Sequence, residues 1–139
     1  MAEQKYDCIV IGSGPGGYVA AIRAAQLGLK TAVVEKGNVG GRCLNEACIP
    51  AKAMLRVAEV FMETQHAGDF GINVEGASVD YHPGATKHRD KVIKTLTSGV
   101  AMLFDKNKID YIEGFGSVTD DGNVKIGASS TAPRSRPTA

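Results

Sequence analysis

The sequence predicts an α/β fold in which a parallel sheet is flanked by helices, and two observations support this expectation. First, an apolar run at 6–11 leads through a glycine-rich turn into a helix-forming stretch and then into a second apolar run at 30–35. Strands joined so closely through a helix pair in parallel by a right-handed crossover. Second, glycine makes up 17 of the 139 residues, or about 12% against the usual ~7%, and much of it lies in two clusters.

The composition is that of one ordinary globular domain. Hydrophobic residues make up 43% of the chain and charged residues 22%, which excludes disordered, collagen-like and miniature disulfide-rich proteins. The formal net charge of +1 disfavours binding to nucleic acid. No apolar run approaches the roughly 18 residues of a membrane span, and the start of the chain has no secretory or transit pattern. We therefore expect a cytoplasmic protein that has neither a nucleic acid nor a membrane as its partner.

The first strand is expected at Tyr6–Ile11, as a parallel strand covered on both faces that ends at Gly12. Cys8 inside it is predicted to be a small buried hydrophobic residue. The following helix ends at Gly28, placed as a C-cap, and the second strand is expected at Lys30–Glu35. The larger apolar residues of that helix stand among alanines and are Tyr18, Val19, Ile22 and Leu27.

Two further helices and two strands are predicted in the rest of the chain. The first helix follows Pro50 and frays near 66–69, with helical spacing of Met54, Val57, Ala58 and Phe61. The second runs from Pro83 to Asn107, with an apolar stripe formed by Val92, Ile93, Leu96, Val100, Leu103 and Phe104. The strands are expected at 109–113 and 117–126, the latter containing a hairpin-like turn at 120–123.

Gly12, Gly14 and Gly17 form a G-x-G-x-x-G motif between the first strand and its helix. This spacing allows a tight turn, close approach of the backbone to a pyrophosphate, and tight packing of the helix on the strand. Glu35, at the end of the second strand, can accept hydrogen bonds from a ribose diol and disfavours a 2′-phosphate. A purely steric glycine turn beside a surface acid is the weaker alternative, because strand, turn, helix and acid occur together.

Cys43 and Cys48 lie five positions apart, just after the second glycine cluster at 37–41. On an ideal helix their Cα atoms would exceed the ~7 Å limit for a bridge, so a disulfide requires a distorted turn. Gly41 before the pair and Pro50 after it favour such a distortion, and a helix N-terminus would stabilise a thiolate. A structural bridge and a zinc site are the weaker alternatives to a redox pair, because a cytoplasmic protein is expected and no second ligand pair stands nearby. We predict no metal site.

Together these motifs resemble the dihydrolipoamide dehydrogenases of the flavin disulfide reductase family. The resemblance is carried by the Gly12-x-Gly14-x-x-Gly17 turn, the helix sequence at 18–28, Glu35, and Cys43-Leu44-Asn45-x-x-Cys48-Ile49-Pro50-x-Lys52-Ala53. Glutathione and mercuric reductases look similar around the cysteines but match the helix at 18–28 less well. The resemblance covers residues 5–126.

The resemblance implies a Rossmann-like FAD-binding domain with a redox-active disulfide. The residues at FAD-contact positions of the family are Gly12, Gly14, Gly17, Glu35, Lys36, Gly41, Arg42, Cys43, Lys52 and Gly116. By the same resemblance, Cys43 is the thiol that exchanges with substrate, Cys48 is the thiol against the flavin, and Lys52 lies near the flavin ring. Members of the family oxidise dihydrolipoamide through the disulfide and FAD to NAD. They act as homodimers and serve lipoyl domains of 2-oxo acid dehydrogenase or glycine cleavage complexes.

Three departures from the family pattern lie around the cysteines. Arg42 stands where the family usually has Thr, and it could pair with a pyrophosphate or obstruct it. Glu46, in a Glu-Ala pair that replaces the usual Val-Gly, places a negative charge beside the thiols and disfavours a thiolate unless Arg42 or Lys52 compensates. Ala51 replaces the usual Ser and is expected to be harmless.

The chain is also much shorter than family members, which carry an NAD domain and a C-terminal dimerisation domain with a His-Glu acid-base dyad. We expect residues 1–126 to form a partial FAD-binding domain, incomplete relative to the full family fold, and residues 127–139 to form a disordered tail. The NAD site is expected to be absent, and His66, His82 and His88 are expected to be surface residues. The alternative function is a truncated, catalytically incomplete FAD-binding module or a non-functional product, with an unpaired sheet edge and poor solubility.

Overall fold

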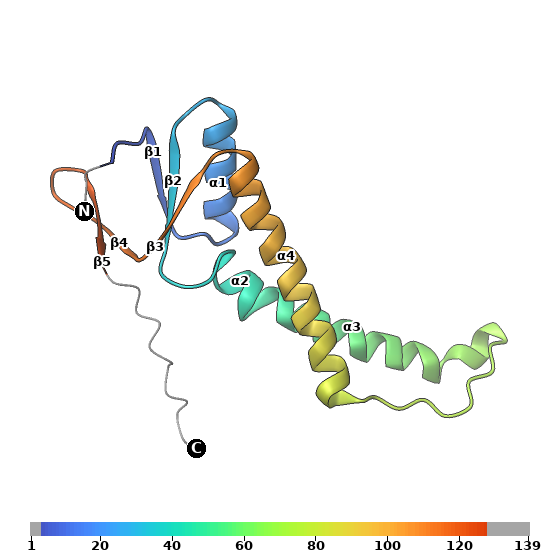
Figure 1. Cartoon of the computed structure of the whole chain (residues 1–139). Coiled ribbons are helices and arrows are strands. Elements are labelled where there is room, and N and C mark those ends of the chain that lie inside the picture. The colour runs from blue at the N-terminus through green and yellow to red at the C-terminus, as the bar shows by residue number, and fades with distance from the viewer. Residues whose placement is uncertain (1–3, 128–139) are drawn as a thin grey trace, which may run out of the picture. The chain divides into compact units, whose positions relative to one another are not determined.

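A computed structural model describes residues 4–127, and these residues divide into two compact units (Figure 1). Unit 1 comprises the residues up to Gly41 and those from Gly99 onward, and unit 2 comprises Arg42–Ser98. The expected α/β class is confirmed, because a parallel sheet is flanked by helices. The expected tail at 127–139 lies outside the described residues except for Gly127.

The sheet of unit 1 has three parallel strands in the order β1-β2-β3. They are β1 (Cys8–Ile11), β2 (Thr31–Glu35) and β3 (Asp110–Glu113). In register, Val33 of β2 lies between Val10 of β1 and Tyr111 of β3. The central strand β2 is buried along its whole length. The strands predicted at 30–35 and 109–113 are therefore confirmed.

Helices cover one face of this sheet. The helix α1 (Pro15–Gln26) follows the glycine turn, and Gly28 comes directly after its C-cap in a left-handed conformation, as predicted. The C-terminal part of α4 (Thr86–Lys106) brings Phe104 onto Tyr111, with ring centroids 6.1 Å apart. Phe104 is only 2% exposed, so its ring is buried between α4 and the sheet.

The other face of the sheet is only partly covered, by an antiparallel hairpin of β4 (Phe115–Val118) and β5 (Val124–Gly127). An open cavity of about 1170 Å³ lies on that face, and its lining combines the hydrophobic residues Ile9, Val34 and Ile112 with polar residues of the N-terminal segment and the hairpin. The prediction that the first strand is covered on both faces is wrong, because Ile9 and Ile11 are 37% and 44% exposed. Cys8 is likewise half-buried rather than buried. The physical reason is that β1 is an edge strand and the hairpin does not cover it fully.

Unit 2 is helical. It contains α2 (Gly41–Asn45) from its second residue onward, α3 (Cys48–Gln65), two short turns η1 (Ala67–Phe70) and η2 (Tyr81–Ala85), and the first part of α4. The helix α3 begins two residues before Pro50, because proline is tolerated in the first turn of a helix. Met54, Val57 and Phe61 are half-buried, but Ala58 is exposed, so that part of the predicted stripe is wrong.

The predicted stripe of α4 is also too wide. Val100 and Phe104 are buried, whereas Leu96 and Leu103 are 40% and 38% exposed. Adjacent residues point about 100° apart on a helix, so Leu103 points away from the side on which Phe104 packs. Among the described residues, no helix is long and apolar enough to cross a membrane.

Candidate cofactor and disulfide site

The glycine turn of unit 1 is closed toward the sheet and open on its other side. The Gly12 N–H donates to the Val34 carbonyl at 2.7 Å. A Cβ on Gly17 would overlap the Gly12 carbonyl oxygen, so only glycine lets α1 approach the strand this closely. A Cβ on Gly14 or Gly16 would meet no atom within 4 Å, and in the described chain no side chain caps the start of α1. The turn therefore leaves room and unused backbone N–H groups for an anion.

Glu35 lies beside this turn and is only 8% exposed. Its Oε2 accepts the N–H of Ser13 at 2.7 Å and the Ser13 hydroxyl at 2.8 Å, and its Oε1 accepts the N–H of Gly37 at 2.9 Å. Burial raises the pKa of this carboxyl, but the hydrogen bonds from Ser13, Gly37 and the Lys36 backbone outweigh burial and lower its pKa overall. Glu35 is thus held as a carboxylate, the form that accepts hydrogen bonds from hydroxyl groups.

Ser13 connects the two glycine clusters, and sequence reasoning did not find it. It is fully buried, and its Oγ accepts the N–H of Gly40 at 3.1 Å while donating to Glu35. Next to this link, a Cβ on Gly41 would lie 2.8 Å from the Gly14 Cα. No sequence signal marks Ser13, because it occupies a variable position of the motif and its partners lie 22 and 27 residues away.

Two other predicted site residues, Lys36 and Gly116, also belong to unit 1. Lys36 is exposed, and its Nζ lies 5.7 Å from the centroid of the Phe115 ring. Gly116 packs against the sheet, where an added Cβ would lie 3.1 Å from Cγ1 of Val34 and 3.3 Å from Cγ2 of Ile11.

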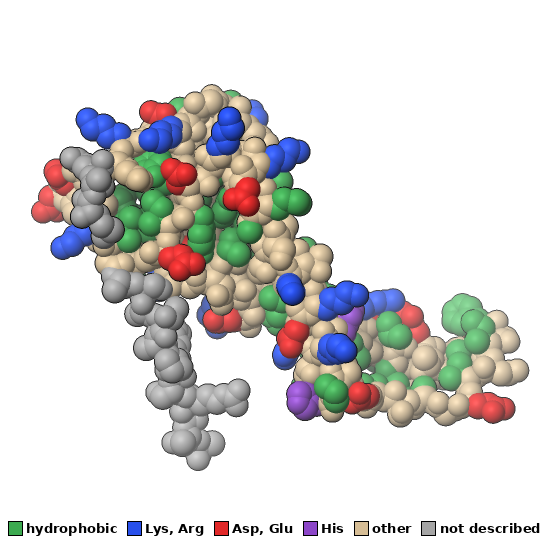
Figure 2. Space-filling model, in the orientation of Figure 1, with side chains coloured by type: hydrophobic (Ala, Val, Ile, Leu, Met, Phe, Trp, Pro, Cys, Tyr) green, Lys and Arg blue, Asp and Glu red, His purple; other side chains and the backbone are tan. Residues whose placement is uncertain are grey.

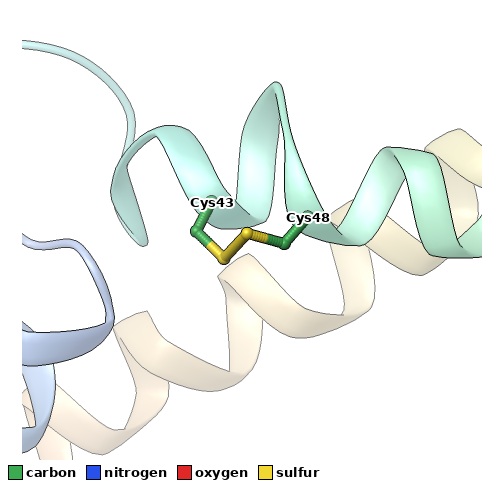
Figure 3. Close-up of a disulfide and its surroundings, with 2 residues drawn as sticks. All are labelled: Cys43 and Cys48. Carbon is green, nitrogen blue, oxygen red and sulfur yellow. A yellow bond between two sulfur atoms is a disulfide. The ribbon is translucent and has the colours of Figure 1, made fainter.

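In unit 2, Cys43 of α2 and Cys48 at the start of α3 form a disulfide (Figure 3). Their Cα atoms are 4.8 Å apart, which is possible because the two helices are separated by a break at 46–47. Pro50 has no N–H to donate to the Glu46 carbonyl, so α2 cannot continue into α3 as one regular helix. The distorted turn that the sequence requires for this bridge is confirmed.

The surroundings of the disulfide are polar. Cys43 is half-buried and Cys48 is exposed. Arg42 pairs with Glu46 across one turn of α2, with Nε and Oε2 3.9 Å apart, and both side chains are largely exposed, so solvent screens this pair. Lys52 is exposed on α3.

The three histidines can also be located. His66, His82 and His88 are exposed, as predicted. Within residues 4–127, no group of three or more His, Cys, Asp or Glu side chains is arranged to hold a metal ion.

A family model and two known proteins match this chain in sequence. A family model described as pyridine nucleotide-disulphide oxidoreductase matches residues 6–133. A dihydrolipoyl dehydrogenase of Rhizobium etli is 53% identical over 131 residues, which cover 94% of this chain and 27% of that protein. One from Chlamydia trachomatis is 50% identical over 124 residues, covering 89% and 26%. The chain thus spans about a quarter of the length of these relatives.

A solved structure shares the fold. It is the copper(II) complex of an HOCl-induced flavoprotein disulfide reductase from Escherichia coli, with a TM-score of 0.68. The match covers 86% of this chain and 24% of that one at 21% sequence identity.

Proposed function

The chain belongs to the pyridine nucleotide-disulphide oxidoreductase family, and from that premise we propose that it is the FAD-binding and disulfide-bearing part of a dihydrolipoyl dehydrogenase. The observation that carries the proposal is the Cys43–Cys48 disulfide, held across a helix break in a chain about half identical to such enzymes. The reaction is the oxidation of dihydrolipoamide through this disulfide and FAD to NAD.

The residues present fit the nucleotide half of FAD. The open turn at Gly14 and the uncapped start of α1 suit a pyrophosphate, and the Glu35 carboxylate suits a ribose. We assign FAD contacts to Gly12, Gly14, Gly17, Glu35, Lys36, Gly41, Arg42, Cys43, Lys52 and Gly116. FAD, when bound, supplies a two-electron acceptor for the reduced cysteine pair.

Cys43 and Cys48 perform the exchange step. One thiolate of dihydrolipoamide attacks the Cys43 sulfur, the Cys43–Cys48 bond breaks, and Cys48 leaves as a thiolate. The second substrate thiolate then attacks the substrate sulfur bonded to Cys43, which closes the lipoamide ring and releases the Cys43 thiolate. Two electrons pass to the cysteine pair, and the two thiol protons pass to a base or to water. Cys48 is suited to leave, because it is the first residue of the 18-residue helix α3, whose N-terminus stabilises a thiolate.

The partners and location follow from the same proposal. The longer enzyme would transfer electrons to NAD, act as a homodimer, and take its substrate from lipoyl domains of 2-oxo acid dehydrogenase or glycine cleavage complexes. The proposed location is the cytoplasm. Relatives named dihydrolipoyl dehydrogenase support the proposed activity and partners, and not the location.

A second candidate function concerns the 139 residues taken on their own. In this candidate they bind flavin, or only cycle the Cys43–Cys48 disulfide, without transferring electrons to NAD. This candidate and the first share the disulfide but differ in whether added dithiol produces turnover.

One experiment tests FAD binding and the reactivity of the disulfide. The purified chain is incubated with FAD, desalted, and its visible absorption spectrum is recorded before and after addition of a dithiol. The proposal predicts retained flavin and a new long-wavelength absorption after reduction, and no such absorption in Cys48→Ser, which cannot present the second thiol. In parallel, thiol titration should rise from one free thiol, Cys8, to three on reduction. Colourless protein would contradict FAD binding by this chain, and a thiol count that does not change would contradict the disulfide.

A further inference from the structure

We propose that Ser13 is a positioning residue of the ribose site and sets the preference of that site for a nucleotide with a free 2′-hydroxyl. The inference rests on the proposed function, because it concerns the nucleotide that the glycine turn and Glu35 would bind. It assigns to Ser13 a role that its place in the glycine motif does not indicate.

The first reason is the way Glu35 is held. The terminal torsion of a glutamate side chain has only a broad intrinsic preference, so neighbouring hydrogen bonds decide how its carboxylate is turned. Here both the N–H and the hydroxyl of Ser13 donate to one oxygen, Oε2, at 2.7 and 2.8 Å. The Ser13 hydroxyl is the only side-chain donor among the hydrogen bonds described for this carboxylate, and the others come from the backbone. Without the hydroxyl, the carboxylate would lose one of its two fixed points at Oε2.

The second reason is that Ser13 also holds the neighbouring turn. Its Oγ accepts the N–H of Gly40 at 3.1 Å, and the next residue, Gly41, packs against Gly14 at the start of α1. One fully buried hydroxyl therefore connects the carboxylate, the turn at 37–41 and the phosphate-facing turn at 12–17. Its removal would leave the buried Gly40 N–H without this acceptor, which is unfavourable in a site closed to water.

The preference for a 2′-hydroxyl follows from pre-organisation. A ribose 2′-hydroxyl that donates to Glu35 gains most when the carboxylate is already oriented, because no ordering cost is left for binding. A 2′-deoxy nucleotide has no 2′-hydroxyl to make this bond, so it gains less from the orientation. Ser13 and the 2′-hydroxyl should therefore be energetically coupled, whereas a residue that merely supported the fold would affect both nucleotides alike.

The test measures binding of ADP and of 2′-deoxy-ADP to the full chain by titration calorimetry. In Ser13→Ala, ADP affinity should fall by about tenfold, the effect of one lost hydrogen bond to a charged group, while 2′-deoxy-ADP affinity changes by less than about twofold. The matched control is Thr31→Val, which removes another buried hydroxyl at the opposite end of β2, where it donates to the Leu29 carbonyl at 3.0 Å. This control should bind both nucleotides as the unchanged chain does.

Each other outcome overturns the role of Ser13 or the proposed function. Equal loss for the two nucleotides, or no loss for either, would overturn the role of Ser13 while ADP binding by the unchanged chain upholds the nucleotide site. Failure of the unchanged chain to bind ADP would overturn the proposed function and this inference together. If Ser13→Ala loses the circular dichroism of the folded chain, Ser13→Cys takes its place, because the thiol fills similar space but is a weak donor and acceptor. The same selective loss of ADP affinity is expected in that variant.

Discussion

Gly16 and Gly17 are neighbours in the first turn of α1, yet an added Cβ would meet different surroundings. On Gly17 it would overlap the Gly12 carbonyl, which is backbone and cannot move aside cheaply, whereas on Gly16 it would meet nothing within 4 Å. We expect Gly17→Ala to lower the free energy of unfolding by about 3 kcal/mol and Gly16→Ala to raise it by up to about 1 kcal/mol. Urea unfolding of both variants measures the difference. Similar changes in the two would contradict the close approach of α1 to the strand.

Glu35 should make the stability depend on pH. Its pKa in the folded chain is lowered from the ordinary value of 4.5, so its contribution is full above that value and is lost as pH falls through the folded pKa. We expect Glu35→Gln to be less stable than the unchanged chain at pH 7, and the gap between them to close as the pH falls below about 4. Urea midpoints at a series of pH values test this. A gap that stays constant with pH would show that Glu35 is not held as a carboxylate by Ser13 and Gly37.

At the residue scale, the sequence predicted those site residues that can be recognised from residue type and spacing alone. Glu35 could be predicted because an acidic residue ends the strand that follows a glycine motif. The helix break at the cysteine pair could be predicted because a bridge between cysteines five positions apart requires it. Ser13 could not be predicted, because its importance comes from its burial and from its hydrogen bonds to Glu35 and Gly40, which lie more than 20 residues away in the sequence. A pattern of short range carries no information on such contacts.

Along α4, adjacent residues differ sharply in how much they pack. Phe104 is 2% exposed and stacks on Tyr111 of β3, whereas Leu103 is 38% exposed. We expect Phe104→Ala to lower the free energy of unfolding by about 3–5 kcal/mol and Leu103→Ala by less than about 1 kcal/mol. The measurement is urea unfolding followed by far-UV circular dichroism. Comparable losses of unfolding free energy in the two variants would mean that α4 does not pack its Phe104 side against the sheet.

At the scale of elements, the order and type of the strands and of the helices α1, α3 and α4 could be predicted, but the short helix α2 and the coverage of the elements could not. The glycine turn, the periodic apolar residues and the turn at 120–123 identify the predicted elements locally. Ile9 and Leu96 were expected to be covered and are exposed, because periodicity shows which side of an element is apolar and not how far a neighbour extends over it. The predicted start of α3 is too late, because a proline in the first turn of a helix resembles a helix boundary in the sequence. The helix begins two residues before Pro50.

For the whole molecule, exposed hydrophobic side chains occur in both units, as Figure 2 shows. In unit 1 they include Leu27 and Val118, which are 64% and 68% exposed, and in unit 2 Phe70 is 81% exposed. The outer edge of β1 also has no partner strand among residues 4–127. Uncovered apolar surface and an open strand edge both favour association with other chains.

We therefore expect the isolated chain to self-associate as its concentration rises, which sedimentation velocity measures directly. Phe70→Ser combined with Val118→Thr should shift the distribution toward the monomer, because these side chains contribute exposed apolar area and little packing. Far-UV circular dichroism should stay unchanged in this variant, since a loss of helix would make association a consequence of unfolding. A chain that sediments as a monomer at every concentration, with a cooperative unfolding transition, would contradict the prediction. That result would mean that the half-covered sheet is stable in water without a partner, and that the open face of β1 is no barrier to folding of this quarter-length chain on its own.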